Sequence, residues 1–378
     1  MKRPVFVLFA SLCVPVLLAG AGKTVRVRTP SAAGVYYPAD AEQLRAAVSQ
    51  YLSEADTIPV PGPVVGCVVP HSPYGAAGSV MASAFKYIQP GQYRRVIVLA
   101  PALQSEFRGC SVPSIQYYRT PLGDVELDGP AVRRICVNGL ITIRGLVYRD
   151  EAYTDARISR QALHEKEPAI EVVLPFLQVQ LGTFQLVPIV VGTLKKVTGE
   201  FDEPALDSIV NTLRSIVDEH TLVVACSDFT RYGAVHNFTP YTDDVVAMIA
   251  GLDQQAIRLV EERRVRGLHA YLKETRNPIS GPEAMSILMR LMPSTSAGVM
   301  TGYDMTARMT GDTRASVSYA GIVFIDGMHE RTTRPAPVRI TDGVRDAARA
   351  EASALANQDP APTPAEAHPP NDAPTGSE

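Results

Sequence analysis

The sequence lacks tryptophan altogether and has no excess of basic residues. Its 36 lysines and arginines stand against 39 aspartates and glutamates, which gives a formal net charge of −3 at pH 7. Because nucleic-acid binding depends on concentrated positive charge, this balance argues against a nucleic-acid partner. Hydrophobic residues make up 46% of the chain and charged residues only 20%, so we expect a buried core rather than disorder throughout.

Several signature motifs are also missing from the sequence. There is no C-x-x-C pair, no P-loop, no dinucleotide fingerprint, no H-E-x-x-H and no G-x-S-x-G elbow. A zinc ribbon, a nucleotide-phosphate loop, a zincin helix and an α/β-hydrolase nucleophile are therefore not expected.

The first 21 residues have the order of a secretory signal. Met1-Lys2-Arg3 carries positive charge, an uncharged and mostly apolar run follows from Pro4 to Leu18, and small residues end it at Ala21. A run of about 15 residues is shorter than the roughly 20 that a spanning helix needs. We expect cleavage of residues 1–21, an extracytoplasmic (periplasmic or secreted) protein and no stable membrane span afterwards; a retained anchor is the alternative.

Prolines and alanines concentrate after Arg331, most densely from Pro360 to Pro364. Such a segment cannot supply a buried face, so residues 331–378 are expected to form a disordered tail. Residues 28–330 are left as one domain.

Short β-branched runs alternate with longer segments of helical periodicity in that domain. Runs of five or six apolar residues are typical of strands buried on both faces, and their alternation with helices predicts a single α/β domain with a mostly parallel central sheet flanked by helices. The expected strands are residues 64–69, 95–100, 186–191 and 222–226, and the expected helices include residues 41–52, 76–87, 170–181 and 204–219.

Three of the expected strands run into segments with functional side chains: Pro70-His71-Ser72-Pro73-Tyr74-Gly75, Ala100-Pro101-Ala102-Leu103, and Ser227-Asp228-Phe229-Thr230-Arg231. In parallel sheets the carboxyl ends of the strands meet at one edge, where binding sites collect. We therefore expect these three segments to lie together.

In that order, the three strand ends resemble the MEMO family, known in prokaryotes as AmmeMemoRadiSam system protein B. Four further segments are similar to family motifs: Gly34-Val35-Tyr36-Tyr37-Pro38, Tyr118-Arg119-Thr120-Pro121-Leu122-Gly123, Glu167-Pro168-Ala169-Ile170-Glu171-Val172-Val173-Leu174-Pro175, and Gly311-Asp312 with Val317-Ser318-Tyr319-Ala320. The resemblance covers roughly residues 33–324. It implies a fold related to class III extradiol dioxygenases, and a cleft where His and Cys side chains bind a metal.

Carried over residue by residue, the resemblance places only part of that metal site here. His71 matches a family histidine, whereas Leu103 stands at the second histidine position and Thr230 at the Cys-like third position. Arg231 replaces the neighbouring histidine. Two histidines of the E-H-S-I-E-x-H-L-P segment are likewise replaced, by Pro168 and Val173.

The polar residues left from that constellation are His71, Asp228 and Glu171. A transition-metal site needs about three imidazole, thiolate or carboxylate ligands, and Arg231 would bring a fixed positive charge close to any cation. We therefore expect no cofactor. Iron or copper held by His71 is the alternative, with His164, His236 or Asp228 as replacement ligands.

Arg231 allows two interpretations. With His71 and the amides at the helix start after Tyr74 it could bind an anion, because guanidinium groups and helix N-termini favour carboxylate and phosphate. The other interpretation is that Arg231 pairs with Asp228 or Glu171 and fills the space left by the lost ligands.

The remaining serine and cysteine side chains bear on two further possibilities, a nucleophilic site and a disulfide bond. Ser72, Ser227 and Asp228 are expected near His71, but Ser227 and Asp228 match family residues and need no hydrolase to explain them. Cys67 and Cys226 fall in buried strands and are interpreted as core residues. A bridge between Cys110 and Cys136 is the remaining pairing considered.

The sequence thus predicts a divergent, exported MEMO-family protein with a degenerate metal cleft, a binding or accessory protein rather than an iron dioxygenase. The ligand-binding residues are expected to be His71, Leu103, Glu171, Asp228, Thr230 and Arg231, and the ligand a small molecule or a protein. The alternatives are a metal-dependent redox enzyme and an envelope protein whose C-terminal tail contacts a partner. The sequence specifies neither ligand nor oligomeric state.

Overall fold

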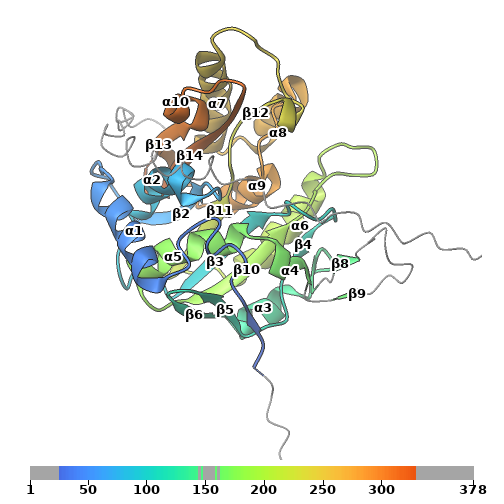
Figure 1. Ribbon diagram of the computed structural model, residues 1–378. Helices are drawn as coiled ribbons and strands as arrows, with labels where there is room; N and C mark the ends of the chain where they lie inside the picture. The colour runs from blue at the N-terminus through green and yellow to red at the C-terminus, as the bar shows by residue number, and fades with distance from the viewer. Residues whose placement is uncertain (1–24, 144–145, 148–157, 160–161, 329–378) are drawn as a thin grey trace, which may run out of the picture.

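Four parallel strands form the centre of the computed structural model, which describes residues 25–143, 146–147, 158–159 and 162–328 (Figure 1). Their order across the sheet is β2 (Val64–Val69), β11 (Thr221–Cys226), β3 (Arg95–Pro101) and β10 (Gln185–Val191). All four coincide with the apolar runs that predicted strands. The predicted signal (1–21) and tail (331–378) lie outside the described residues.

Antiparallel strands extend this parallel centre on both sides. Beside β2 lies β14 (Ala315–Ile325), which pairs with β13 (Ala297–Met305) and β12 (Arg231–Gly233); beside β10 lie β4 (Cys110–Ser111) and β7 (Ile141–Thr142). The expected parallel arrangement therefore forms the middle of a larger mixed sheet, in which β4 and β7 are parallel to each other at one edge. Two smaller sheets contain β1 (Val27–Arg28), β5 (Tyr117–Thr120) and β6 (Gly123–Glu126), and β8 (Leu146–Val147) and β9 (Ile158–Ser159).

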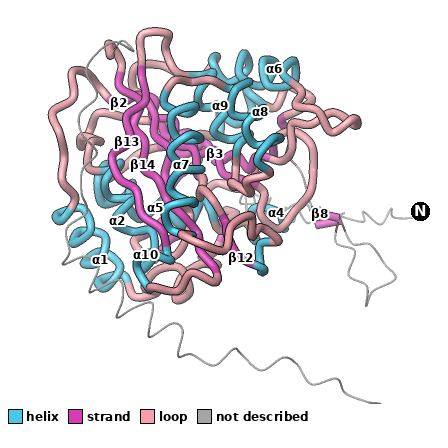
Figure 2. Tube along the Cα trace, turned by 90° about the horizontal axis from the view of Figure 1, so that it is seen from above, coloured by secondary structure: helices cyan, strands magenta, loops and turns pink. Residues whose placement is uncertain are grey.

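Helices cover both faces of the large sheet (Figure 2). On one face lie α1 (Ala41–Glu54), α2 (Tyr74–Phe85) and α5 (Ala169–Leu181), and on the other α3 (Gly129–Ile135), α6 (Glu203–Arg214), α7 (Val245–Glu261), α8 (Val265–Thr275) and α9 (Pro282–Leu291). The shorter elements are α4 (Ala162–Lys166), α10 (Thr306–Thr310) and the 3-10 turn η1 (Ala234–His236). The predicted α/β domain with flanking helices is confirmed.

Strand residues alternate between two hydrophobic clusters, one on each face. In β3, Val96, Val98 and Ala100 pack with α1, α2 and α5, whereas Ile97 and Leu99 pack with the opposite helices. Because successive side chains of a strand point to opposite faces, a continuous apolar run is what a doubly covered strand requires. Polar groups therefore collect where the strands end.

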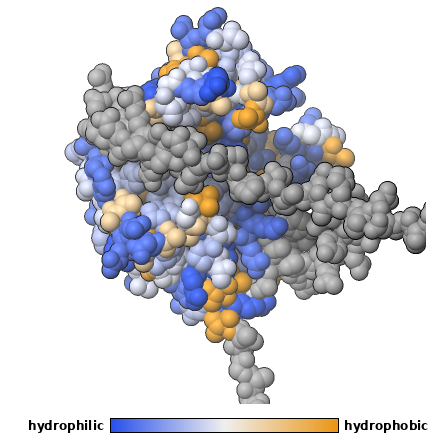
Figure 3. Space-filling view, viewed as in Figure 1, coloured by the Kyte–Doolittle hydropathy of each residue, from blue (hydrophilic) through white to orange (hydrophobic). Residues whose placement is uncertain are grey.

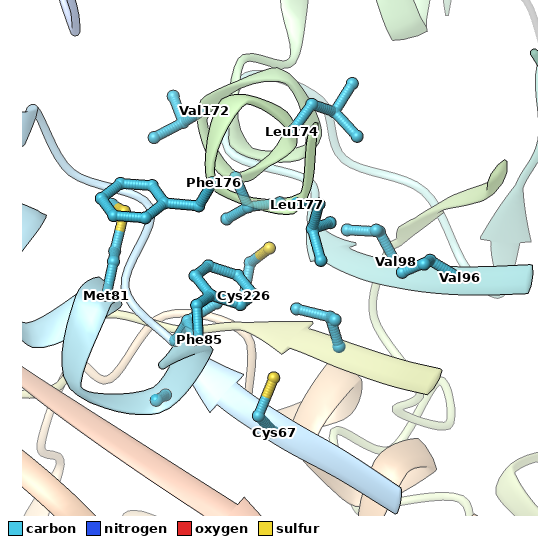
Figure 4. Close-up of a cluster of buried hydrophobic side chains, with 14 of the residues drawn as sticks. Cys67, Met81, Phe85, Val96, Val98, Val172, Leu174, Phe176, Leu177 and Cys226 are labelled. Carbon is cyan, nitrogen blue, oxygen red and sulfur yellow. The ribbon is translucent and has the colours of Figure 1, made fainter. Parts of the chain in front are cut away.

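None of the four cysteines of the described residues forms a disulfide bond. Cys67 and Cys226 are buried in the cluster beneath α5, close to Phe85 and Phe176 (Figure 4), as predicted for core residues. Burial raises the pKa of both thiols. No bond joins Cys110 to Cys136 in the structure, so the bridge considered from the sequence is not formed.

Hydrophilic residues predominate on the face seen in Figure 3, and hydrophobic residues form small separate groups there. Exposed large apolar side chains are scattered over turns and short segments, for example Val35, Val137, Val197 and Val235. Within the described ranges, no helix is long and apolar enough to cross a lipid bilayer.

Candidate functional site

Asp228 lies just beyond the end of β11 and organises the polar groups around the strand ends. Its carboxylate is completely buried. Oδ1 accepts a hydrogen bond from the main-chain N–H of His71 at 3.0 Å, and Oδ2 accepts one from Ser72 Oγ at 2.7 Å. Arg231 Nη2 contacts Oδ2 at 3.4 Å. A buried carboxylate is tolerated only with such partners, so Asp228 joins the loops after β2 and β11.

His71 has its imidazole buried in this group, with 2% of the residue exposed. Nε2 lies 2.9 Å from Ser280 Oγ, and Nδ1 lies 3.6 Å from Asp228 Oδ2. Burial lowers the pKa of His71; Asp228 opposes this effect and Arg231 adds to it. The imidazole is therefore neutral at pH 7.

Ser280 comes from the loop before α9 and is tied to Asp228 by main-chain contacts. Its Oγ accepts a hydrogen bond from the Asp228 N–H at 2.9 Å, and its N–H donates to the Asp228 carbonyl at 3.0 Å. Gly281 follows with φ of +71°, and a Cβ there would lie 2.7 Å from the Cys226 carbonyl oxygen. Only glycine fits this approach, so Gly281 fixes Ser280 beside the strand ends.

The interpretation of Arg231 as a partner of Asp228 agrees with the contact at 3.4 Å. Arg231 is in β12, which pairs with β14, and 29% of its side chain is exposed. Its other predicted partner, Glu171, is engaged elsewhere.

Thr230, predicted to belong to the ligand-binding residues, has its hydroxyl engaged by residues of α7 and the loop after α8. Its Oγ1 donates to Asp253 Oδ1 on α7 at 2.6 Å and accepts from Asn277 Nδ2 at 2.8 Å. The second Asp253 oxygen accepts from the Tyr303 hydroxyl at 2.7 Å. Thr230 therefore anchors α7 behind β11 instead of facing the site.

Leu103 is partly buried and packs against the hydrophobic cluster beneath α5. Its main-chain N–H donates to Glu167 Oε2 at 2.8 Å, and the N–H of Gln104 donates to Oε1 at 2.9 Å. Burial raises the pKa of Glu167 and these amides oppose the rise. Glu167 thus holds the loop at Leu103 through main-chain hydrogen bonds. The Leu103 side chain offers no polar group to a ligand.

Glu171 was predicted to lie in the ligand-binding cleft, but its carboxylate is occupied by the N-terminal segment. Arg28, the Tyr37 hydroxyl, both the N–H and hydroxyl of Ser31, and the Ala32 N–H all donate to it. Glu171 is 0% and Arg28 2% exposed. Through these contacts Glu171 holds the start of the domain against α5.

Of the two histidines considered as replacement ligands, His164 is engaged away from His71. His164 Nδ1 contacts the Tyr118 hydroxyl at 2.7 Å, and its Nε2 lies 3.1 Å from the Ser111 carbonyl oxygen, so both ring nitrogens have partners in a buried structural network. His236 lies in η1 and is partly exposed; burial and the charge of Arg231 lower its pKa.

The donor set at the strand ends does not fit a transition metal. Across the described residues, no three His, Cys, Asp or Glu side chains are arranged to hold an ion. At the site itself, His71 and Asp228 are the strong donors, and Asp228 already accepts from protein groups that include a guanidinium. A cation placed there would compete with Arg231, so we assign no metal-dependent step to these residues.

The fold and the strand-end group together define an α/β protein with its candidate site at the carboxyl edge of a parallel sheet. The family model described as "Memo-like protein" matches residues 28–323, and the chain belongs to this family. It is 28% identical to Protein MEMO1 of Xenopus laevis over 269 residues (69% of this chain, 83% of the relative). It is 26% identical to Protein MEMO1 of Mus musculus (78% and 95%) and to Protein memo-1 homolog of Caenorhabditis elegans (79% and 83%).

His71, Asp228 and Arg231 were predicted together and are together in the structure, whereas Ser280 was missed. No local motif marks Ser280, because it lies in a loop 52 residues after Asp228. The sole hint in the sequence is the Gly281-Pro282 pair, which is typical of a helix start.

Proposed function

We propose that this protein is an exported member of the Memo-like family that works without a bound transition metal, as a binding or accessory protein. Its site is the group around His71 and Asp228 at the strand ends. The metal-dependent redox enzyme considered from the sequence is less well supported, because His164 has both ring nitrogens engaged by Tyr118 and Ser111, and because no three His, Cys, Asp or Glu side chains of the described residues are grouped to hold an ion.

The observation that carries this proposal is the state of the Asp228 carboxylate. Both oxygens accept from protein donors, and Arg231 lies at 3.4 Å, where it balances the negative charge. His71 has its Nε2 against a serine hydroxyl. Leu103 and Thr230 stand at the positions that the family resemblance assigns to further ligands. The Leu103 side chain packs against the hydrophobic cluster, and the Thr230 hydroxyl bonds Asp253 on α7.

Protein purified from its native compartment is expected to contain far less than one iron, copper or zinc atom per chain. Elemental analysis of the wild-type protein and of His71→Ala, prepared without chelators, is the measurement. Ser208→Ala, a substitution at an exposed position on α6, serves as the control for purification. Stoichiometric iron or copper that disappears in His71→Ala would overturn the metal-free proposal.

Export predicts that the mature chain begins at Gly22 and is found outside the cytoplasm. Mass spectrometry of the N-terminal peptide, after cell fractionation, measures both. A variant lacking residues 4–18 should remain in the cytoplasm, because the apolar run supplies the export signal. Recovery of the wild-type chain in the cytoplasmic fraction with residues 1–21 attached would contradict this part of the proposal.

A further inference from the structure

The hydroxyl of Ser280 faces the imidazole of His71, which in turn lies against the carboxylate of Asp228. Ser280 Oγ is 2.9 Å from Nε2, and Nδ1 is 3.6 Å from Asp228 Oδ2. These groups stand in the order of a serine nucleophile, a base and a carboxylate, which recurs on unrelated folds. At 3.6 Å the carboxylate acts on the imidazole through its charge and not through a hydrogen bond. From this arrangement we infer that Ser280 is a nucleophile, activated by His71, that accepts acyl groups from carboxylic esters.

The neighbouring carboxylate favours the tautomer in which the proton of His71 is on Nδ1. Nε2 then carries the lone pair and accepts from the Ser280 hydroxyl. His71 is buried, which fixes the ring, whereas Ser280 is partly exposed. A fixed base beneath a partly exposed hydroxyl is the geometry that nucleophilic catalysis needs.

The contacts of Ser280 also favour negative charge on its oxygen. The Asp228 N–H donates to Oγ at 2.9 Å, and a hydrogen bond to the charged form stabilises that form. The hydroxyl proton has two acceptors within reach, Nε2 at 2.9 Å and the Asp228 carbonyl oxygen at 3.2 Å, of which the imidazole nitrogen is the closer.

Neither serine considered from the sequence shares this arrangement. Ser72 Oγ donates to the Asp228 carboxylate, and Ser227 Oγ donates to the Ser280 carbonyl oxygen. Both serve to hold Asp228 and the Ser280 loop in place. Ser280 therefore differs from both in having its hydroxyl against the imidazole of His71.

The proposed reaction balances with water as the second substrate. Ser280 Oγ forms a bond to the ester carbonyl carbon while its proton passes to His71 Nε2; the alkoxy bond then breaks, and the departing alkoxide takes that proton as an alcohol. Water next gives a proton to Nε2 and its oxygen attacks the acyl carbon. The bond to Oγ breaks, Ser280 regains the proton, and the net change is ester plus water to acid plus alcohol.

This inference goes beyond the proposed binding function but rests on its metal-free part, because a metal on Nε2 would occupy the base. The test is covalent labelling of the full chain, purified after export, with a fluorophosphonate probe. Such a probe forms a phosphorus–oxygen bond with an activated serine and releases fluoride. We expect one adduct, mapped to Ser280 by peptide mass spectrometry.

Two variants and one control distinguish the role of Ser280 as the nucleophile from that of His71 as the base. Ser280→Ala should abolish the adduct, and His71→Asn should slow labelling by about 10²- to 10⁴-fold, the range for loss of a general base. Ser208→Ala, on the exposed face of α6, should be labelled at the wild-type rate. The same ranking is expected for hydrolysis of p-nitrophenyl acetate.

The wild-type experiment needs no variant to fold, so it decides the inference by itself. Absence of an adduct on Ser280, while an added serine esterase in the same tube is fully labelled, would overturn it. Metal analysis of the same preparation keeps the two proposals apart: a metal-free but unlabelled protein refutes the nucleophile alone, whereas stoichiometric metal on His71 refutes the proposed function.

Discussion

Replacing Glu171 by alanine is expected to lower the free energy of unfolding by about 3 to 5 kcal/mol. The substitution leaves the Arg28 guanidinium buried beside an empty space, with its charge uncompensated. The Tyr37 hydroxyl and the amides of Ser31 and Ala32 lose their acceptor at the same time. Removing one partner of a buried ion pair is costly because the other partner cannot return to water without moving the segment that carries it.

Urea denaturation followed by circular dichroism measures this change. Glu165→Ala is the matched control: Glu165 is exposed in α4 in the same region, and its loss should change stability by less than about 0.5 kcal/mol. Typical domains are stable by about 5 to 15 kcal/mol, so Glu171→Gln, which keeps one acceptor oxygen, provides a milder second variant. Equal stability of the Glu171 and Glu165 variants would show that the Arg28 contact contributes nothing.

The α/β architecture could be predicted because the burial of the central strands leaves a recognisable pattern of apolar residues in the sequence. Residues 64–69 and 222–226 are apolar at every position, which only a strand covered on both faces requires, and both are strands. The antiparallel edges could not be predicted in the same way. Strands such as β4 and β12 have two or three residues, and their pairing depends on long-range contacts that no local pattern records.

The candidate site was predictable only where it sits on a strand end. His71 and Asp228 follow apolar runs directly, so their position at one edge of the sheet follows from the parallel arrangement. Ser280 reaches the site from a loop, and Arg28 reaches Glu171 on α5 from β1, which pairs with β5. No local pattern marks either contact. The family resemblance placed Thr230 beside His71. In the structure the Thr230 hydroxyl donates to Asp253 instead, because a buried carboxylate needs hydrogen-bond donors.

Stability is also expected to fall in mild acid, and His164 is a large part of the reason. Burial lowers the pKa of His164 to about 3, and Arg28 adds to this effect, whereas the contact with the Ser111 carbonyl opposes it. The unfolded chain binds a proton on this residue near its ordinary pKa of 6.5, while the folded chain does not. The stabilising contribution is therefore complete above about pH 6.5 and is lost progressively as the pH falls toward 3.

One proton corresponds to about 1.4 kcal/mol per pH unit, so His164 accounts for a loss of about 2 kcal/mol between pH 7 and pH 5. Glu171 contributes little in this interval. Burial alone would raise its pKa, but Arg28 and the Tyr37 hydroxyl outweigh this and hold the pKa below its ordinary value of 4.5, so its effect appears in stronger acid. His71 and His269 have lowered pKa values and act in the same direction as His164. Burial raises the pKa of Glu167, Asp253 and Glu283, and these carboxyls oppose the loss because the folded chain binds their protons more readily than the unfolded chain does.

The contribution of His164 can be separated by comparing how the unfolding free energy changes with pH in the wild type and in variants. His164→Gln is expected to reduce the difference in unfolding free energy between pH 7 and pH 5 by about 2 kcal/mol, even though the variant is less stable at both pH values. Tyr118→Phe removes the hydrogen bond to Nδ1 but leaves the imidazole buried, so it should lower stability and keep the wild-type slope. If His164→Gln retained the full pH dependence, the acid sensitivity would have to come from the other buried histidines, and His164 would be protonated as easily in the folded protein as in the unfolded chain.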